Sequence, residues 1–143
     1  LEDILGEYDY VLIDCPPSLG LLTLNALTVA NEIFIPLQTE FFALQGVSKL
    51  IQTFDVIKKR LNSSLEITGI IVCMYDSRTK LGQAVLDKIK EYFAEKVFVT
   101  TIRKNIKLSE STSHGMPITS YAPDSNGAQD YEALTKEIIA QEK

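Results

Sequence analysis

The stretch YDYVLIDCPPS at residues 8–18 decides the expected fold class. Its apolar run, residues 10–13, has the uninterrupted, β-branched character of a strand that is buried on both faces of a parallel sheet. The run ends in one carboxylate, Asp14, and Pro16 and Pro17 then prevent the strand from continuing. Because ligands of open α/β sheets bind outside the carboxyl ends of the strands, Asp14 is expected to lie where the chemistry takes place.

The segments that follow this stretch alternate between strand and helix. Further strands are predicted at residues 32–37 (EIFIPL), 67–74 (ITGIIVCM) and, shorter, 96–101. Apolar side chains spaced by three and four predict helices over residues 44–61, 81–93 and 131–138, with residues 124–126 available to cap the last one. Short connections between alternating elements predict right-handed βαβ crossovers, and therefore an α/β fold with a parallel sheet flanked by helices.

Composition indicates one ordered domain, or most of one. The 143 residues are 45% apolar and 23% charged, and no apolar run approaches the roughly 20 residues that span a bilayer. A net charge of −5 means that contact with nucleic acid must come from a local basic cluster. Cys15 and Cys73, with a single histidine, form no metal-ligand pattern, and we interpret both as reduced core thiols of a cytoplasmic protein.

The residues alone leave two interpretations of Asp14 open. A carboxylate at the end of a buried strand can hold a hydrated magnesium ion, because Mg²⁺ keeps several waters and takes only one or two protein carboxylates. The same pattern fits an aspartate that ends a strand and caps the following turn. An apolar run plus aspartate favours the cap, and the double proline that follows weighs against it.

At this point the chain resembles a known family. Residues 8–27 are similar to the Walker B and switch II segment of the ParA/Soj partition ATPases, in the deviant-Walker group that includes MinD. The similarity continues in order through residues 35–50, 74–85, 102–118 and 121–134. It implies that residues 1–143 are the C-terminal part of one such ATPase domain, with a partial P-loop-NTPase-like parallel sheet.

The family's phosphate-binding loop is missing from this sequence. No glycine-rich KGGxGKT-type segment occurs, and the first residue is Leu1 rather than Met. Backbone N–H groups and a lysine of such a loop hold the phosphates of ATP. We therefore expect a chain cut from something longer, without the N-terminal strand and P-loop, and unable to hydrolyse ATP alone.

The resemblance also implies roles for individual residues. It makes Asp14 the catalytic residue, near Mg²⁺ and its water, and it places Cys15, Pro16, Pro17 and Ser18 in the segment that senses the γ-phosphate of ATP. It places the adenine pocket in two loops, with the candidate cofactor-binding residues Met74, Asp76, Ile102, Arg103 and Asn105. Arg103 departs from the family pattern, in which proline is common, and this difference puts the path of the second loop in question.

Basic residues in the same two loops are candidates for DNA binding. In Soj-like proteins the positions that match Arg78 and Lys107 are associated with non-specific DNA binding, and Lys104 matches a commonly basic position. Cations converging from two loops can contact phosphates, and a dimer doubles their number. Without the resemblance, a solvated loop with scattered charge is the favoured interpretation. Lys104 and Lys107 stand where arginine is common, and lysine still neutralises phosphate, as a point charge.

Two further features receive no catalytic role. His114 lies in SHGMP, a turn sequence, and is interpreted as a hydrogen-bonded structural residue. Glu40, Phe41 and Phe42 open a predicted helix, and we interpret the two aromatic residues as core or dimer-facing packing.

The family resemblance implies an ATP-dependent switch for chromosome or plasmid partition. ATP holds two subunits together as a homodimer, the dimer binds DNA non-specifically, and a ParB-like partner stimulates hydrolysis; the protein is then cytoplasmic and nucleoid-associated, with no membrane partner. One alternative is a MinD-like membrane-associated regulator of cell division, which needs a basic amphipathic C-terminal helix, but residues 131–143 carry more acidic than basic side chains. Another is a binding module without enzymatic activity, whose sheet lacks its first strand and exposes an edge.

Overall fold

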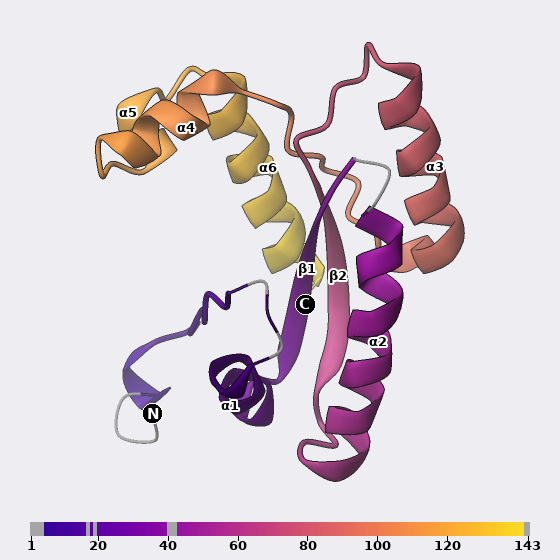
Figure 1. Ribbon diagram of the computed structural model, residues 1–143. Coiled ribbons are helices and arrows are strands. Elements are labelled where there is room, and N and C mark those ends of the chain that lie inside the picture. Colours follow the sequence, from indigo (N-terminus) through magenta and orange to yellow (C-terminus); the bar gives the residue numbers. More distant parts are fainter. Residues whose placement is uncertain (1–4, 17, 19, 40–42, 142–143) are drawn as a thin grey trace.

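The computed structural model describes residues 5–16, 18, 20–39 and 43–141, and of Leu5 and residues 43–49 only the backbone (Figure 1). The elements are, in chain order, η1 (Leu5–Glu7), α1 (Leu21–Val29), β1 (Glu32–Gln38), α2 (Ala43–Arg60), β2 (Glu66–Cys73), α3 (Lys80–Phe93), η2 (Ala94–Lys96), α4 (Ile106–Ser113), α5 (Ile118–Tyr121) and α6 (Asn126–Gln141). None of the helices in these described stretches is long and apolar enough to span a bilayer.

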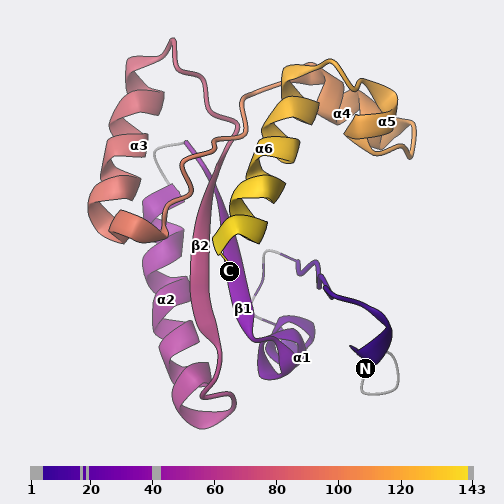
Figure 2. The ribbon, with the colours of Figure 1, turned by 180° about the vertical axis from the view of Figure 1, so that it is seen from behind.

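The sheet consists of β1 and β2, which run parallel and are joined by α2. Their pairing extends from Glu32 opposite Glu66 to Gln38 opposite Cys73, with one shift where β2 carries an extra residue, Thr68. Helices α2 and α3 cover one face of the sheet and α6 covers the other, as Figures 1 and 2 show from opposite sides. The predicted α/β class, two of its strands and its three long helices are therefore confirmed.

The core fills both faces of this small sheet. On the face covered by α2 and α3, the buried cluster consists of Ile35, Leu37, Ile70, Val72, Val85, Leu86 and Ile89. On the opposite face, Phe98, Ile102 and Leu134 form a second cluster against α6. The Phe98 ring packs directly over Gly69, where a Cβ atom would come within 2.0 Å of the ring. Only glycine leaves room for this contact.

Residues 97–103 run along the outer edge of β2 without forming the strand that the sequence predicts. They make two isolated parallel bridges, Val97 with Ile70 and Arg103 with Tyr75. The backbone N–H of Phe98 donates to the Ile70 carbonyl at 3.1 Å, and the N–H of Ile102 donates to the Val72 carbonyl at 2.8 Å.

Helix α6 accepts three further backbone N–H groups of this segment. The carboxylate of Glu137 accepts from the N–H of Val99 at 2.7 Å and of Thr100 at 2.9 Å. Asp130, two turns earlier on α6, accepts from the N–H of Arg103 at 2.9 Å. The predicted strand is wrong here because the backbone donors of this segment are divided between β2 and α6.

Residues 10–13, predicted to be a buried strand, lie outside the sheet. They are extended without strand pairing, and Leu12 is 87% exposed. The prediction is wrong for a physical reason: none of the described strands lies beside this segment to complete a ladder, and an apolar run alone does not make a strand. Cys15 is consequently half-buried in this segment rather than in the core, whereas Cys73 lies partly buried against the Phe98 cluster. Both thiols are free, and burial raises the pKa of Cys73.

Candidate functional site

The carboxyl ends of the strands form the candidate site, at the upper end of Figure 1. Thr39, just beyond β1, donates its hydroxyl to the carbonyl of Met74, just beyond β2, at 3.5 Å. Met74 has a φ of 53°, a left-handed backbone conformation that residues other than glycine rarely adopt. Backbone strain of this kind gathers at ligand sites, because the surrounding structure must enforce it.

Two loops meet at this edge and are joined by backbone hydrogen bonds. The N–H of Tyr75 donates to the carbonyl of Ile102, and the N–H of Lys104 donates to the carbonyl of Tyr75, both at 3.1 Å. Residues 74–76 and 102–105 therefore lie side by side. The fold brings together the candidate adenine-binding residues Met74, Asp76, Ile102, Arg103 and Asn105, whose contact with a base stays a prediction.

The first loop is closed by an ion pair between Asp76 and Arg78. The guanidinium donates from Nε and Nη2 to the two carboxylate oxygens at 2.9 and 2.8 Å, and the Arg78 N–H donates at 3.0 Å. The side-chain hydrogen bonds from Arg78, then its backbone N–H, lower the pKa of Asp76 from 3.8 to about 2, and the positive charges of Arg78 and Lys104 act in the same direction. Asp76 therefore remains ionised at neutral pH and holds Arg78 at the loop.

The second loop is tied to α6 through Arg103. Its guanidinium donates to Asp130 from Nε at 3.0 Å and from Nη2 at 2.6 Å, and its backbone N–H donates to the same carboxylate. Asp130 is only 7% exposed. A proline at position 103, common in the resembling family, has no N–H for this bond. The arginine thus has a structural partner in α6, and its guanidinium points there rather than lying free for adenine.

Helix α4 begins at the end of the second loop. The side chain of Asn105 caps it by accepting from the N–H of Lys107 at 2.8 Å. The ammonium of Lys107 pairs with Glu110 at 2.6 Å and lies 5.9 Å from the centre of the Tyr121 ring. The hydrogen bond to Glu110 raises the pKa of Lys107. The pairing with Glu110 therefore favours the charged form of Lys107.

His114 ends α4. Its backbone N–H donates to the carbonyls of Glu110 and Ser111, and its ring stacks on Tyr121 with centroids 5.2 Å apart. Gly115 follows with a φ of 62°, which glycine adopts readily. These contacts agree with the structural interpretation of His114.

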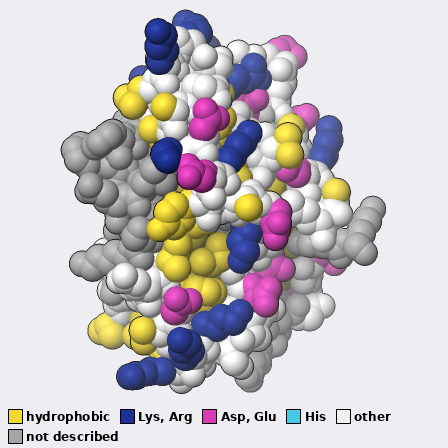
Figure 3. Space-filling view, turned by 90° about the vertical axis from the view of Figure 1, so that its right-hand side faces the viewer, with side chains coloured by type: hydrophobic (Ala, Val, Ile, Leu, Met, Phe, Trp, Pro, Cys, Tyr) yellow, Lys and Arg dark blue, Asp and Glu magenta, His cyan; other side chains and the backbone are white. Residues whose placement is uncertain are grey.

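The three DNA-binding candidates lie on exposed parts of the two loops and α4. Arg78 and Lys107 are each paired with an acidic neighbour, whereas Lys104 has no ion-pair partner within 4.0 Å in the described part of the chain. Solvent screens exposed ion pairs and makes them weak, so a phosphate can displace the carboxylate partner. The side view in Figure 3 shows acidic and basic side chains interspersed around an apolar hollow. Any basic surface is therefore local.

The segment that carries Asp14 lies elsewhere. Residues 5–16 run beside α1, away from the two loops in both Figures 1 and 2. The fold does not bring Asp14, Cys15 or Pro16 to the candidate site, and Pro17 lies outside the described residues, as do Glu40, Phe41 and Phe42. The Ser18 carbonyl accepts from the Thr23 hydroxyl at 2.6 Å.

The described residues fit the base end of a nucleotide better than its phosphates. The joined loops provide backbone and side-chain groups around a strained turn, and Asp14 offers one carboxylate, enough for a hydrated Mg²⁺ but not for a direct metal cage. Among the described residues, no group of three or more His, Cys, Asp or Glu side chains could hold a metal ion.

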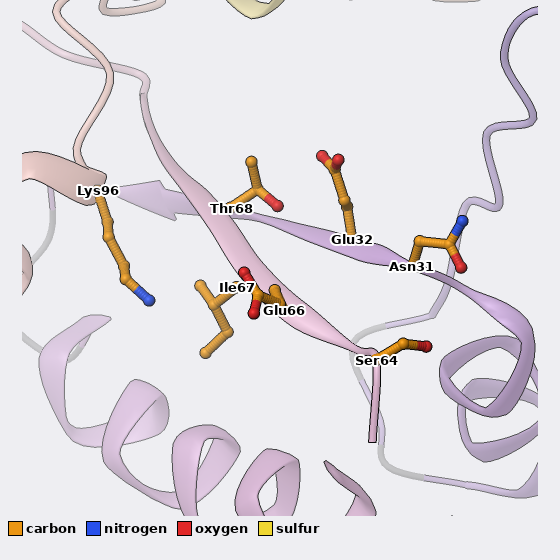
Figure 4. A pocket seen from close by; sticks show the side chains of 7 residues that line it. All are labelled: Asn31, Glu32, Ser64, Glu66, Ile67, Thr68 and Lys96. Carbon is orange, nitrogen blue, oxygen red and sulfur yellow. The ribbon is translucent and has the colours of Figure 1, made fainter. Parts of the chain in front are cut away.

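A shallow pocket at the amino ends of the strands is a poorer candidate. Its lining residues are Asn31, Glu32, Ser64, Glu66, Ile67, Thr68 and Lys96. Figure 4 shows Glu32 and Thr68 on one side of the strands and Ile67 on the other, toward α2. Glu32 and Glu66 are register neighbours, and Lys58 pairs with Glu66 at 3.6 Å. Ligands of parallel sheets bind at the opposite edge.

Sequence reasoning found the two loops and missed the residues that hold them. Asp130 and Glu137 lie on a helix whose apolar face was recognised, but 27 or more residues from the backbone groups that they accept. The only signal in the sequence is their spacing of seven, which places two acids on one face of the helix beside Leu134. That spacing is common on solvated faces as well.

Comparison with known proteins also indicates a nucleotide-binding fold. A family model described as an AAA domain matches residues 1–67. Among solved structures, cobyrinic acid a,c-diamide synthase from Mycobacterium smegmatis with bound ADP and magnesium superposes with a TM-score of 0.77 at 30% identity, covering 96% of this chain and 49% of that one. The cell division ATPase MinD of Pyrococcus furiosus gives 0.76 at 26% identity, covering 98% and 55%. The fold is that of the P-loop ATPases.

Sequence relatives narrow this class. The chromosome-partitioning ATPase Soj of Treponema pallidum is 53% identical over 142 residues, 99% of this chain and 56% of that protein. The sporulation initiation inhibitor protein Soj of Bacillus subtilis is 49% identical over 98% of this chain and 55% of its own length. Over nearly its whole length the chain is therefore similar to Soj/ParA partitioning ATPases, as the sequence motifs predict, and it spans about half the length of these relatives.

Proposed function

We propose that this chain is part of an ATP-dependent partition switch and supplies its adenine-contacting loops and DNA-contacting cations. The observation that carries the proposal is the backbone junction between residues 74–76 and 102–105, which gathers both sets of candidates at one edge of the sheet. Identity of 53% with a chromosome-partitioning ATPase supports the reaction class.

The residues of this chain would divide the work between binding and sensing. The two joined loops would frame the base. Asp14 would hold the water shell of Mg²⁺, and residues 15–18 would respond to the γ-phosphate. Bound MgATP supplies the phosphoryl group and the charge that such a switch senses. Residues 1–143 alone would not hydrolyse ATP, because this sequence contains no glycine-rich phosphate-binding loop.

The DNA contact would come from Arg78, Lys104 and Lys107. Each cation that meets a phosphate releases a counterion, so the affinity depends steeply on salt. Lys104 meets a phosphate at no cost in internal pairing, whereas Arg78 and Lys107 exchange one anionic partner for another. Pairing of two chains in an ATP-dependent homodimer would double these contacts. Such a dimer would bind DNA non-specifically, as a cytoplasmic, nucleoid-associated protein. A ParB-like partner would then release it from the DNA.

The test is DNA binding by the full-length protein that contains this chain. Fluorescence anisotropy on an arbitrary duplex, with ATP and with ADP, compares Lys107→Ala with Lys88→Ala. Lys88 is a matched control because it also pairs with a glutamate three residues on, Glu91, but on α3. We expect ATP-dependent binding that Lys107→Ala weakens, with a salt slope reduced by about 1, while Lys88→Ala leaves it unchanged. Equal effects of both variants, or binding independent of ATP, would contradict the proposal.

A second candidate is a MinD-like membrane-associated regulator, which the likeness to the Pyrococcus MinD structure favours at the level of the fold. Sedimentation of the full-length protein with anionic vesicles separates the two. Binding to vesicles but not to DNA, with ATP present, would favour the regulator. We expect the reverse, because α6 carries Glu132 and Glu137 against one lysine, Lys136.

A further inference from the structure

We propose that Asp130 is a positioning residue that fixes residues 102–105 against α6 and thereby sets the preference of the site for adenine over other bases. This inference rests on the proposed nucleotide site. It assigns a role to a buried carboxylate on a helix that carries none of the other candidate residues.

The contact is a clamp on both the backbone and the side chain of one residue. Asp130 accepts the backbone N–H of Arg103 at 2.9 Å and two guanidinium donors of the same arginine at 3.0 and 2.6 Å. Both carboxylate oxygens are used, and the side chain of Asp130 is only 9% exposed. Such a bidentate, charge-assisted contact fixes direction as well as distance.

The clamp completes the attachment of the loop on a third side. On one side, Ile102 donates to β2 through the Val72 carbonyl; on another, Ile102 and Lys104 exchange backbone hydrogen bonds with Tyr75. The N–H of Arg103, which lies between these attachments, donates to Asp130. Without the carboxylate this N–H has no acceptor, and the loop is free to turn toward water.

A loop held in this way favours one base by geometry. Discrimination between bases depends on fixed donors and acceptors that match one pattern of edge groups and leave partners unpaired with another. A mobile loop can adapt to either base and loses that preference. In the proposed site these two loops meet the base and not the phosphates, so loosening the loop is expected to change base discrimination more than phosphate binding.

The experiment measures nucleotide binding by the full-length protein with isothermal titration, using ADP and GDP. The variants are Asp130→Asn, Arg103→Pro and the double variant Arg103→Pro with Asp130→Ala; Glu132→Gln, an exposed acid two residues further along the same helix, is the control. We expect Asp130→Asn to weaken ADP about tenfold, equivalent to about 1.4 kcal/mol, and GDP little, so that the ratio of the two affinities falls.

The double variant tests the clamp itself. Arg103→Pro alone leaves a buried carboxylate without partners, and Asp130→Asn weakens the acceptor of the Arg103 N–H. Removing both the donor and the carboxylate leaves neither group unpaired. We therefore expect the double variant to bind ADP more tightly than the Arg103→Pro single variant, a non-additivity that independent sites do not show.

The outcomes separate this inference from the function on which it rests. If the unmodified protein binds neither ADP nor GDP, the nucleotide proposal fails. If it prefers ADP and Asp130→Asn retains that preference in full, as Glu132→Gln does, the positioning role is overturned and the function stands. Should Asp130→Asn fail to fold, Arg103→Pro takes its place because it removes both the backbone and the guanidinium contact with Asp130, and an unchanged ADP to GDP ratio in that variant likewise overturns the role.

Discussion

Gly69 lies on β2 where the ring of Phe98 crosses the strand. A Cβ atom added there meets three ring atoms within 3.0 Å, the nearest at 2.0 Å. Because Phe98 is 2% exposed and stacked with Phe34, the ring cannot move without disturbing the α6 side of the core. The glycine is thus selected by its neighbour rather than by its backbone angles.

We predict that Gly69→Ala destabilises the protein by about 1–3 kcal/mol, the usual cost of overpacking a core. The measurement is the free energy of unfolding from urea denaturation. Gly6→Ala is the control, because a Cβ there meets nothing within 4 Å. A Gly69→Ala variant as stable as Gly6→Ala would mean that the ring does not pack on the strand in solution.

The Asp76 carboxylate gives a prediction about pH. Its pKa of about 2 in the folded state lies below the ordinary 3.8, so its contribution to stability is fully present above pH 3.8 and is lost as the pH falls toward 2. We expect the carboxyl resonance of Asp76 in an NMR titration to move near pH 2, and to move at higher pH in Arg78→Ala. The same midpoint in both proteins would show that Arg78 does not hold the carboxylate.

At the scale of elements, the pattern of apolar residues predicted the helices and strands that pack in the core. The two strands could be predicted from the sequence because β1 and β2 bury apolar side chains on both faces of the sheet, and helices α2, α3 and α6 because each has an apolar stripe at helical spacing. Helix α1 escaped prediction because its apolar residues have no helical period, with Leu21 and Leu22 exposed while Thr23 is buried. Helix α4 escaped because its eight residues are mostly polar.

The candidate site could also be predicted only in part. Its two loops could be predicted because parallel strands bring their carboxyl ends together. The acceptors on α6 could not, since nothing local in the sequence links Asp130 to Arg103 across 27 residues. The predicted strand at residues 10–13 failed because a strand requires a neighbour, and its own residues do not specify one.

The contact of Glu137 with the segment beside β2 can be tested by substitution. We predict that Glu137→Gln weakens its contacts with the N–H groups of Val99 and Thr100. Glu137→Ala leaves both N–H groups to water at a cost of about 1 kcal/mol, because Val99 is exposed. Hydrogen exchange should be faster at these two amides in Glu137→Ala. Glu132→Ala, on an exposed turn of α6, is the control. Equal exchange rates in both variants would show that Glu137 does not protect these two amides.

At the scale of the whole molecule, apolar surface is unevenly placed. Exposed apolar side chains gather in the segment before Pro16 and on α1, among them Tyr8, Leu12, Leu21 and Leu22. Exposed apolar side chains of this kind promote association between chains.

We predict that the 143-residue chain self-associates as its concentration rises and that Leu12→Asp reduces this association. Light scattering across a concentration series measures it. Ile106→Asp is the control, because Ile106 is also strongly exposed, at 76% against 87% for Leu12, but lies on α4. Equal scattering by the two variants would show that Leu12 does not lie in the surface that mediates self-association.

The clamp between Arg103 and Asp130 also has a consequence for how such sequences change over time. A proline at position 103 and an arginine held by an acid are two alternative ways to satisfy one stretch of backbone. Replacing either partner first produces an intermediate with a stranded donor or a stranded carboxylate, which selection disfavours. Positions 103 and 130 are therefore expected to be inherited as a pair, and lineages that switch between the two solutions should be few.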